Sequence, residues 1–348
     1  ELAVTAAPPK PRPSAKAPVR TMRAARLGRI PNENMFYLQL VVLRGYLLWV
    51  ATMVTAPQLT PNQITPTHQL VPPTASERIP PRVLATIYQQ RALVRAFASR
   101  DISTRYRTSS LGWAWSLVQP LVALLVYAAV FSLVFKIQAP PLGADPERTS
   151  FAAFLFTGMV TWNLFSGLLL QSMGSLKSNG ELLRKVHFPA WTPVLGTSIV
   201  QLIQVALEVL VLIGMFAFQR NIGISWLVAI PILIATALFA QGVGFILSIA
   251  NARFGDVQYM VTVSLGALYF LTPVLYPMSL VEDTASWLAW IVKLNPMTWF
   301  VTAMHDVMYS LQYPEWWVVP ALLVFGAATF AAGFKIFERW SEDIGEIL

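Results

Sequence analysis

Long apolar runs fill the chain from about residue 116 onward. They lie at residues 116–137, 151–175, 193–218, 226–250, 257–277 and 316–337, and each contains few charged residues. A helix needs about 20 apolar residues to cross a bilayer. The pattern therefore predicts an all-α integral membrane protein, with six transmembrane helices in a domain that covers residues 116–348.

A segment of a different kind, residues 82–115, precedes the first predicted span. Apolar side chains at helical spacing form one face of it, and two arginines lie beside that face; these residues are Val83, Ile87, Val94 and Phe97, with Arg91 and Arg95. Such an amphipathic pattern is typical of a helix on a membrane surface. We expect an interface helix at 82–99, followed by a basic connector at 100–110 that leads into the membrane.

Residues 1–81 are expected to form an N-terminal extension that is basic, rich in proline and mostly disordered. Within it, residues 35–54 are apolar enough to suggest a span, but Arg44 near the centre argues against one. We favour an interfacial helix there. The alternatives are a cleaved signal peptide, or a natural start of translation at Met53 that makes residues 1–52 an upstream extension.

Charge is distributed unevenly along the 348 residues. Only 12% of them are charged, against about 25% in a typical soluble protein. The net charge is +8, and fifteen Lys or Arg face four Asp or Glu before residue 116. Loops with an excess of Lys and Arg face the cytoplasm. That rule places the segment before the first span, the loop around 177–185 and both termini in the cytoplasm.

The long loop after the fifth predicted span contains two short apolar segments, at residues 284–295 and 297–309. Each is too short to cross a bilayer, and the Asn-Pro pair between them is a turn signal. We expect a re-entrant helical hairpin, which is tolerated at membrane depth only when it is buried in protein or lines a cavity. Pro273 and Pro277 would bend or end the preceding helix. Together these features predict the outer end of a translocation pathway.

The sequence lacks the residues that several kinds of chemistry need. It has no cysteine and its three histidines are far apart, so no metal site is expected. The dipeptide Gly-Lys of a phosphate-binding loop does not occur. We therefore expect no cofactor bound by this chain and no catalytic residue. A nucleic-acid partner is not expected either, because membrane spans directly follow the basic N-terminal region. If the protein moves a substrate uphill, a separate subunit hydrolyses ATP.

Polar residues on the third predicted span are candidates to line a pathway through the membrane. Gln201, Gln204 and Glu208 are spaced to share one helical face, and a charge buried in lipid is costly. The same stripe could instead hydrogen-bond neighbouring helices, and the sequence favours neither interpretation. For Asn163 and Gln171 on the second span, contacts between helices are the favoured interpretation.

Aromatic residues are abundant near the ends of the predicted spans, which is typical of a membrane-interface belt. A minority lie at the broken helix and the hairpin. Those are candidates to line a channel, because flat rings stack on the apolar faces of sugars. They are Tyr269, Phe270, Tyr276, Trp299 and Phe300.

The basic connector carries a second candidate site. Arg105 and Arg107 are candidates for binding a diphosphate or a lipid headgroup, because planar guanidinium groups bind phosphate with paired hydrogen bonds. The alternative is an ordinary positive anchor on the cytoplasmic side.

Four stretches resemble the ABC-2-type polysaccharide exporter permeases, in the order in which that family has them. They are RDISTRYRTSSLGWAWSLVQPLV at 100–122, NGELLRKVHFP at 179–189, NARFGDVQYM with LYFLTPVLYP within 251–277, and LNPMTWF at 294–300. The resemblance covers about residues 82–345.

The resemblance implies a homodimeric permease in the cytoplasmic membrane of a bacterium, with a separate ABC ATPase that binds ATP and Mg²⁺. The implied cargo is O-antigen, teichoic acid or another glycan on a polyprenyl diphosphate. Arg105, Tyr106 and Arg107 would form a gate for the lipid diphosphate, and the aromatic candidates would line a channel between protomers. The residues implied to couple the permease to the ATPase are Arg91, Arg95, Glu181, Arg184 and Lys185.

Composition adds a narrower expectation. The preference for Arg over Lys, the Ala- and Pro-rich extension and the lack of cysteine suggest a GC-rich actinobacterium. The glycan would then be the lipid-linked galactan of the cell wall. Two other functions remain open. One is a membrane-embedded glycosyltransferase or polymerase, for which Glu282 and Asp283 are the nearest paired acids, and the other is a non-catalytic scaffold of an envelope complex.

Overall fold

The computed structural model describes residues 90–105, 112–134, 136, 139–143, 145–186, 188–284 and 286–341. The chain divides into two units, Glu1–Pro72 and Pro73–Leu348, and every described residue belongs to the second. The extension at 1–81, with its interfacial helix at 35–54, lies outside the described residues. So does the part of the interface helix before residue 90.

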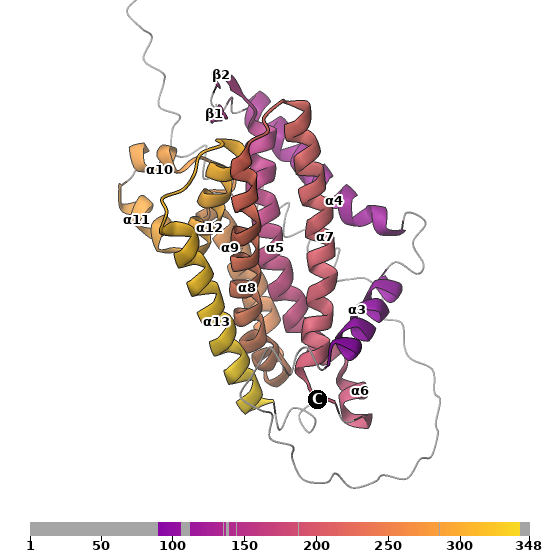
Figure 1. Cartoon of the computed structure of the whole chain (residues 1–348). Helices are drawn as coiled ribbons and strands as arrows, with labels where there is room; N and C mark the ends of the chain where they lie inside the picture. Colours follow the sequence, from indigo (N-terminus) through magenta and orange to yellow (C-terminus); the bar gives the residue numbers. More distant parts are fainter. Residues whose placement is uncertain are drawn as a thin grey trace, which may run out of the picture. The chain divides into compact units, whose positions relative to one another are not determined.

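The described residues fold almost entirely into helices (Figure 1). In chain order these are α3 (Arg91–Arg105), α4 (Trp115–Ala129), α5 (Phe151–Ser178), α6 (Gly180–Lys185), α7 (Trp191–Phe218), α8 (Ala229–Arg253), α9 (Val257–Leu271), α10 (Met278–Thr284), α11 (Ser286–Leu294), α12 (Pro296–Met304) and α13 (Val318–Trp340). Short 3-10 segments, Gly112–Ala114 and Ile224–Val228, precede α4 and α8, and π-helical turns, Val130–Val134 and His305–Tyr309, extend α4 and α12. A small antiparallel hairpin joins β1 (Pro141–Leu142) to β2 (Asp145–Thr149). The expected all-α class is therefore confirmed, with this hairpin as an addition.

Five of the six expected spans are long and apolar enough to cross a membrane. They are Trp115–Val134, Phe151–Ser178, Trp191–Phe218, Ile224–Arg253 and Val318–Trp340.

The remaining span was expected at 257–277, but α9 has 15 residues and ends at Leu271. Thr272 is extended, with φ −97° and ψ 138°, because the residue before a proline is driven out of the helical region. The helix therefore does not continue to residue 277 as expected, whereas the predicted break at Pro273 is confirmed. Whether α9 completes a sixth crossing stays a prediction.

Helix α5 lies at the centre of the bundle, and most of its residues are buried. Both α7 and α8 pack along its length, and α4, α9 and α12 contact it elsewhere (Figure 1). Ser150 caps the start of the helix, because its hydroxyl accepts the Ala153 N–H at 3.4 Å. Because α5 touches so many other elements, it sets where they lie.

Helices α8 and α13 pack backbone against backbone. A Cβ atom added at Gly333 would overlap the carbonyl group of Gly242, and one added at Gly326 would press on the carbonyl oxygen of Ala235. The two small residues on each helix are seven positions apart, so they recur on one face. Small residues allow this approach, and the resulting van der Waals contact holds helices together in a membrane.

The expected break of the hairpin at Asn295-Pro296 is observed, between α11 and α12. The Asn295 Oδ1 accepts the Met297 N–H at 3.0 Å, and its Nδ2 donates to Thr272 Oγ1 at 2.8 Å. Asn295 therefore caps α12 and also ties it to the end of α9. Side chains of α12 such as Phe300 and Val301 are fully buried in the bundle. Entry of this hairpin into the bilayer stays a prediction.

Helix α3 continues through the first half of the expected connector, to Arg105. The segment contains no Gly or Pro, and the Ser103 and Thr104 hydroxyls donate to the carbonyls of Ser99 and Arg100 within the helix. The predicted end at residue 99 is thus wrong. The apolar face of α3, with Phe97 buried, packs against α7.

The Gly333–Gly242 contact makes a prediction about stability. Gly333→Ala should lower the melting temperature of the purified protein, because overpacking at a close contact costs about 1–3 kcal/mol. Gly214→Ala is the matched control, since a Cβ atom at Gly214 would have no heavy atom within 4 Å. Thermal unfolding in detergent checks both. Equal melting temperatures for the two variants would contradict the close α8–α13 contact.

Candidate functional site

The predicted coupling residues on the loop after α5 lie on the short helix α6. Glu181, Arg184 and Lys185 are all exposed, and the Lys185 ammonium lies 3.8 Å from the Glu181 carboxylate. The helix ends at Lys185, and the next residue, Val186, is extended. It therefore presents a charged surface directly after the central helix.

Two contacts join α3 to this region. The Arg100 Nη1 donates to Asn179 Oδ1 at 3.2 Å, and the rings of Phe97 and Phe188 lie 5.3 Å apart. Between the elements lies a cavity of about 460 Å³, lined by Arg100, Lys177, Ser178, Asn179, Glu181, Leu182 and Lys185. We call these lining residues, with the neighbouring Arg184, the α3–α6 surface.

The α3–α6 surface contains only part of the predicted coupling set. Arg91 and Arg95 are exposed nearer the start of α3 and do not line the cavity. Sequence reasoning missed Arg100 and Lys177 as members of one cavity. The Lys177 Nζ also donates to Asn251 Oδ1 on α8 at 3.3 Å. The only signal for this arrangement was the excess of basic residues in both segments.

The predicted lipid-diphosphate gate lies almost wholly outside the described part of the chain. Arg105 is the last residue of α3, and its side chain is not described. Tyr106 and Arg107 belong to residues 106–111, which the structure does not describe. Their proposed role therefore stays a prediction.

The polar stripe on α7 faces the central helix α5. The Asn163 Nδ2 donates to Glu208 Oε2 at 3.0 Å. The Gln201 Nε2 donates to the Asn163 carbonyl at 2.9 Å, and its Oε1 accepts from Gln171 Nε2. These bonds connect two membrane-spanning helices within one protomer.

The hydrogen bonds of this stripe match one of the two interpretations given above, in which its polar side chains bond a neighbouring helix and do not line a pathway. Glu208 and Gln201 are buried, and Gln204 is half-buried. One carboxylate oxygen, Glu208 Oε1, has no hydrogen-bond partner among the described residues. A channel-lining role for the stripe stays a prediction.

The five aromatic candidates are distributed over different environments. The Tyr269 ring lies 5.5 Å from Trp162, and the Tyr276 hydroxyl donates to the Phe270 carbonyl at 2.9 Å. Phe300 is fully buried, whereas its neighbour Trp299 is 45% exposed.

Contacts between rings run across the bundle from the first candidate to the last. Successive centroids 5.5 to 6.4 Å apart connect Tyr127, Tyr269, Trp162, Phe165, Phe239 and Phe300. These rings come from α4, α9, α5, α8 and α12. Within one protomer they form part of the core, so their role as channel lining is not established.

The π-helical turn after α12 was missed by sequence reasoning. The His305 ring stacks on Phe154 with centroids 4.0 Å apart, and its Nε2 donates to the Phe154 carbonyl at 3.0 Å. Burial lowers the pKa of His305 to about 4, so the ring is neutral. The Tyr309 hydroxyl donates to the Pro140 carbonyl at 2.7 Å. A histidine within an apolar segment was the only available signal.

Comparison with known proteins identifies relatives over most of the chain. Residues 92–309 match the model of a protein family described as ABC-2 type transporter. An O-antigen export system permease protein, RfbA of Myxococcus xanthus, is 29% identical over 270 residues, which are 76% of this chain and 98% of that protein. RfbA of Klebsiella pneumoniae is 26% identical over 267 residues, 74% of this chain and 95% of its own. The polysialic acid transport protein KpsM of Escherichia coli is 22% identical over 256 residues, with coverage of 73% and 95%.

The α5–α7 network makes a prediction for Glu208. Glu208→Gln should keep the wild-type melting temperature, because an amide can still accept from Asn163. Glu208→Leu should destabilise the protein by about 1–3 kcal/mol, since it leaves buried polar groups unpaired. Thermal unfolding of both variants in detergent is the measurement. A wild-type melting temperature for the leucine variant would show that the network does not hold α7 on α5.

Proposed function

Because this chain belongs to the ABC-2 type transporter family, we propose that it is the permease subunit of a polysaccharide exporter in the bacterial cytoplasmic membrane. One observation carries the proposal: the O-antigen export permease of Myxococcus xanthus aligns over 98% of its own length. The five long apolar helices supply the membrane domain that such a subunit needs. The permease itself would carry out no chemical step.

A separate ABC ATPase would supply the energy, with ATP and Mg²⁺ bound there. The whole sequence lacks the Gly-Lys pair of a phosphate-binding loop, which supports this division. The ATPase would dock on the α3–α6 surface, whose exposed charges include Arg184 and Lys185. Both termini would also lie in the cytoplasm, as the distribution of loop charges predicts.

The cargo would be a glycan attached to a polyprenyl diphosphate. Arg105, Tyr106 and Arg107, which lie in the sequence between α3 and the first span, would receive the diphosphate. Guanidinium groups suit this task, because they form paired, charge-assisted hydrogen bonds to phosphate oxygens. In a GC-rich actinobacterium, the source that the composition suggests, the glycan would be the lipid-linked galactan of the cell wall.

The pathway would run between two copies of the chain. In one protomer, the Gln201 and Glu208 side chains of α7 are buried and hydrogen-bonded to α5, so they offer little to hydrated sugars. A hydrophilic passage therefore needs surfaces that a second protomer completes. This argument supports a homodimer.

The function is tested by restoring export in cells that lack this chain. The wild-type chain should restore the glycan at the cell surface, and the double variant Arg105→Ala, Arg107→Ala should not, because it loses both phosphate-binding forks. The surface glycan is measured by antibody or lectin labelling. Co-purification of the ATPase with the double variant is the control for intact assembly.

The outcomes separate the proposals. The wild-type chain could leave the surface glycan unchanged and alter the length of the polymer inside the cell. That result would instead support a glycosyltransferase or polymerase. Normal export by the double variant would reject the arginine gate alone. A chain that purifies without an ATPase would support a non-catalytic scaffold.

Crosslinking tests the docking of α6 on the ATPase. The chain contains no cysteine, so a single introduced cysteine is the only site that a thiol-reactive label can modify. A single Arg184→Cys, carrying a photoreactive label, should crosslink to the ATPase in membranes. Ala217→Cys is the matched control, since Ala217 is also exposed but lies in the last turn of α7. Immunoblotting detects the product. Crosslinks from residue 184 to lipid but never to the ATPase would reject docking on α6.

A further inference from the structure

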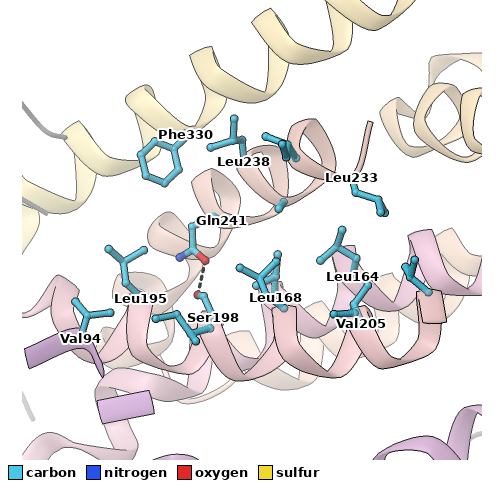
Figure 2. Close-up of a pocket in the computed structure, with 16 residues that line it drawn as sticks. Val94, Leu164, Leu168, Leu195, Ser198, Val205, Leu233, Leu238, Gln241 and Phe330 are labelled. Atoms are coloured by element: carbon cyan, nitrogen blue, oxygen red, sulfur yellow. Dashed lines mark hydrogen bonds between the residues drawn. The ribbon is translucent and has the colours of Figure 1, made fainter. Parts of the chain in front are cut away.

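An apolar groove lies between α7 and α8, above the central helix α5. Both helices pack along α5 but make few contacts with each other, so they diverge over it. The groove has a volume of about 630 Å³. Figure 2 shows Leu195, Ser198 and Val205 along one side and Leu233, Leu238 and Gln241 along the other. Its walls therefore belong to two predicted membrane-spanning helices.

The lining of the groove is almost completely apolar. Of the 16 residues that line it, all except Ser198 and Gln241 are apolar. These two side chains bond each other across the groove (Figure 2), and the Gln241 Nε2 also donates to Ser172 Oγ at 3.3 Å. Their polar atoms are thus already satisfied. The groove suits hydrocarbon and offers little to a hydrated sugar or an ion.

The groove is open along its length to the surroundings of the bundle. Leu202 on α7 is 44% exposed and Ile234 on α8 is 50% exposed, although both line it. In a membrane these residues face acyl chains. A lipid can therefore enter from the side without any movement of the bundle.

One end of the groove lies beside basic residues of α3. Val94 forms this end, next to Leu195 (Figure 2). Arg91 lies one helical turn before Val94 and Arg95 directly follows it, and both are exposed. The groove is thus long and apolar, with positive charges beside one end. This matches the shape and charge of an anionic phospholipid.

We propose that this groove binds one acyl chain of an anionic glycerophospholipid of the bilayer, with its phosphate beside Arg91 and Arg95. The volume is in the range of pockets for one small ligand, roughly 300–1,000 Å³, and is too small for a long polyprenyl chain. The lipid would fill the space that α7 and α8 leave open over α5. It is distinct from the transported lipid-linked glycan.

Native mass spectrometry of the purified full chain in mild detergent tests the proposal. Phosphatidylglycerol and phosphatidylcholine with identical acyl chains are the probes, each added to delipidated protein. Phosphatidylglycerol should be retained preferentially, as one molecule per chain. Ala237→Phe, which fills the groove from α8, should weaken retention by about tenfold or more. Ala217→Phe, on an exposed position of α7 outside the groove, should retain the lipid.

A second variant keeps the test decisive if Ala237→Phe fails to fold. Arg95→Gln should weaken retention of phosphatidylglycerol by about tenfold, the loss expected for a charge-assisted contact. Arg339→Gln, which removes an exposed charge at the end of α13, should not. Equal retention of both phospholipids, or preferential retention of a polyprenyl phosphate, would overturn the proposal. Crosslinking of a second copy of the chain through the groove would also overturn it.

Discussion

At membrane depth, a polar group on the central helix α5 can gain a hydrogen bond only from the protein, because the bilayer core supplies none. Some partners are on the helix itself: Thr157 and Thr161 donate to the carbonyls one turn before them. Others lie on neighbouring helices. Asn163 bonds Glu208 on α7, and Ser172 accepts from Gln241 on α8. The positions of α7 and α8 follow from these bonds, and α13 follows α8 through the glycine contact.

Packing of both α7 and α8 on α5 also leaves an open groove between these two helices. Helices α7 and α8 both pack along α5 and make few contacts with each other. The Ser198–Gln241 pair is a polar bridge across the gap. Such an open apolar groove would be in contact with water in a soluble protein, but in a membrane its open side faces hydrocarbon. Lipid can therefore act as a packing element of this fold.

The long elements could be predicted from the sequence, because spans depend on the local run of apolar residues and the α11–α12 break on an Asn-Pro pair. The sequence did not allow us to predict which helix packs against which face of another helix. Periodicity placed Gln201, Gln204 and Glu208 on one face, but only the structure shows that this face meets α5. Likewise the apolar face of α3 was assigned to lipid, whereas Phe97 packs over Gly196 of α7. A one-dimensional pattern cannot distinguish a lipid surface from an apolar helix.

These contacts also restrict how the α3–α6 surface can act on the rest of the domain. Helix α6 follows α5 directly, while α3 packs on the start of α7. A force applied to that surface therefore reaches α5 and α7 together. Separating those two helices would break several buried hydrogen bonds, each costing about 1–3 kcal/mol. Movement of the pair as one rigid body costs none of them. We therefore expect a transport pathway to open at the boundary of this pair and not within it.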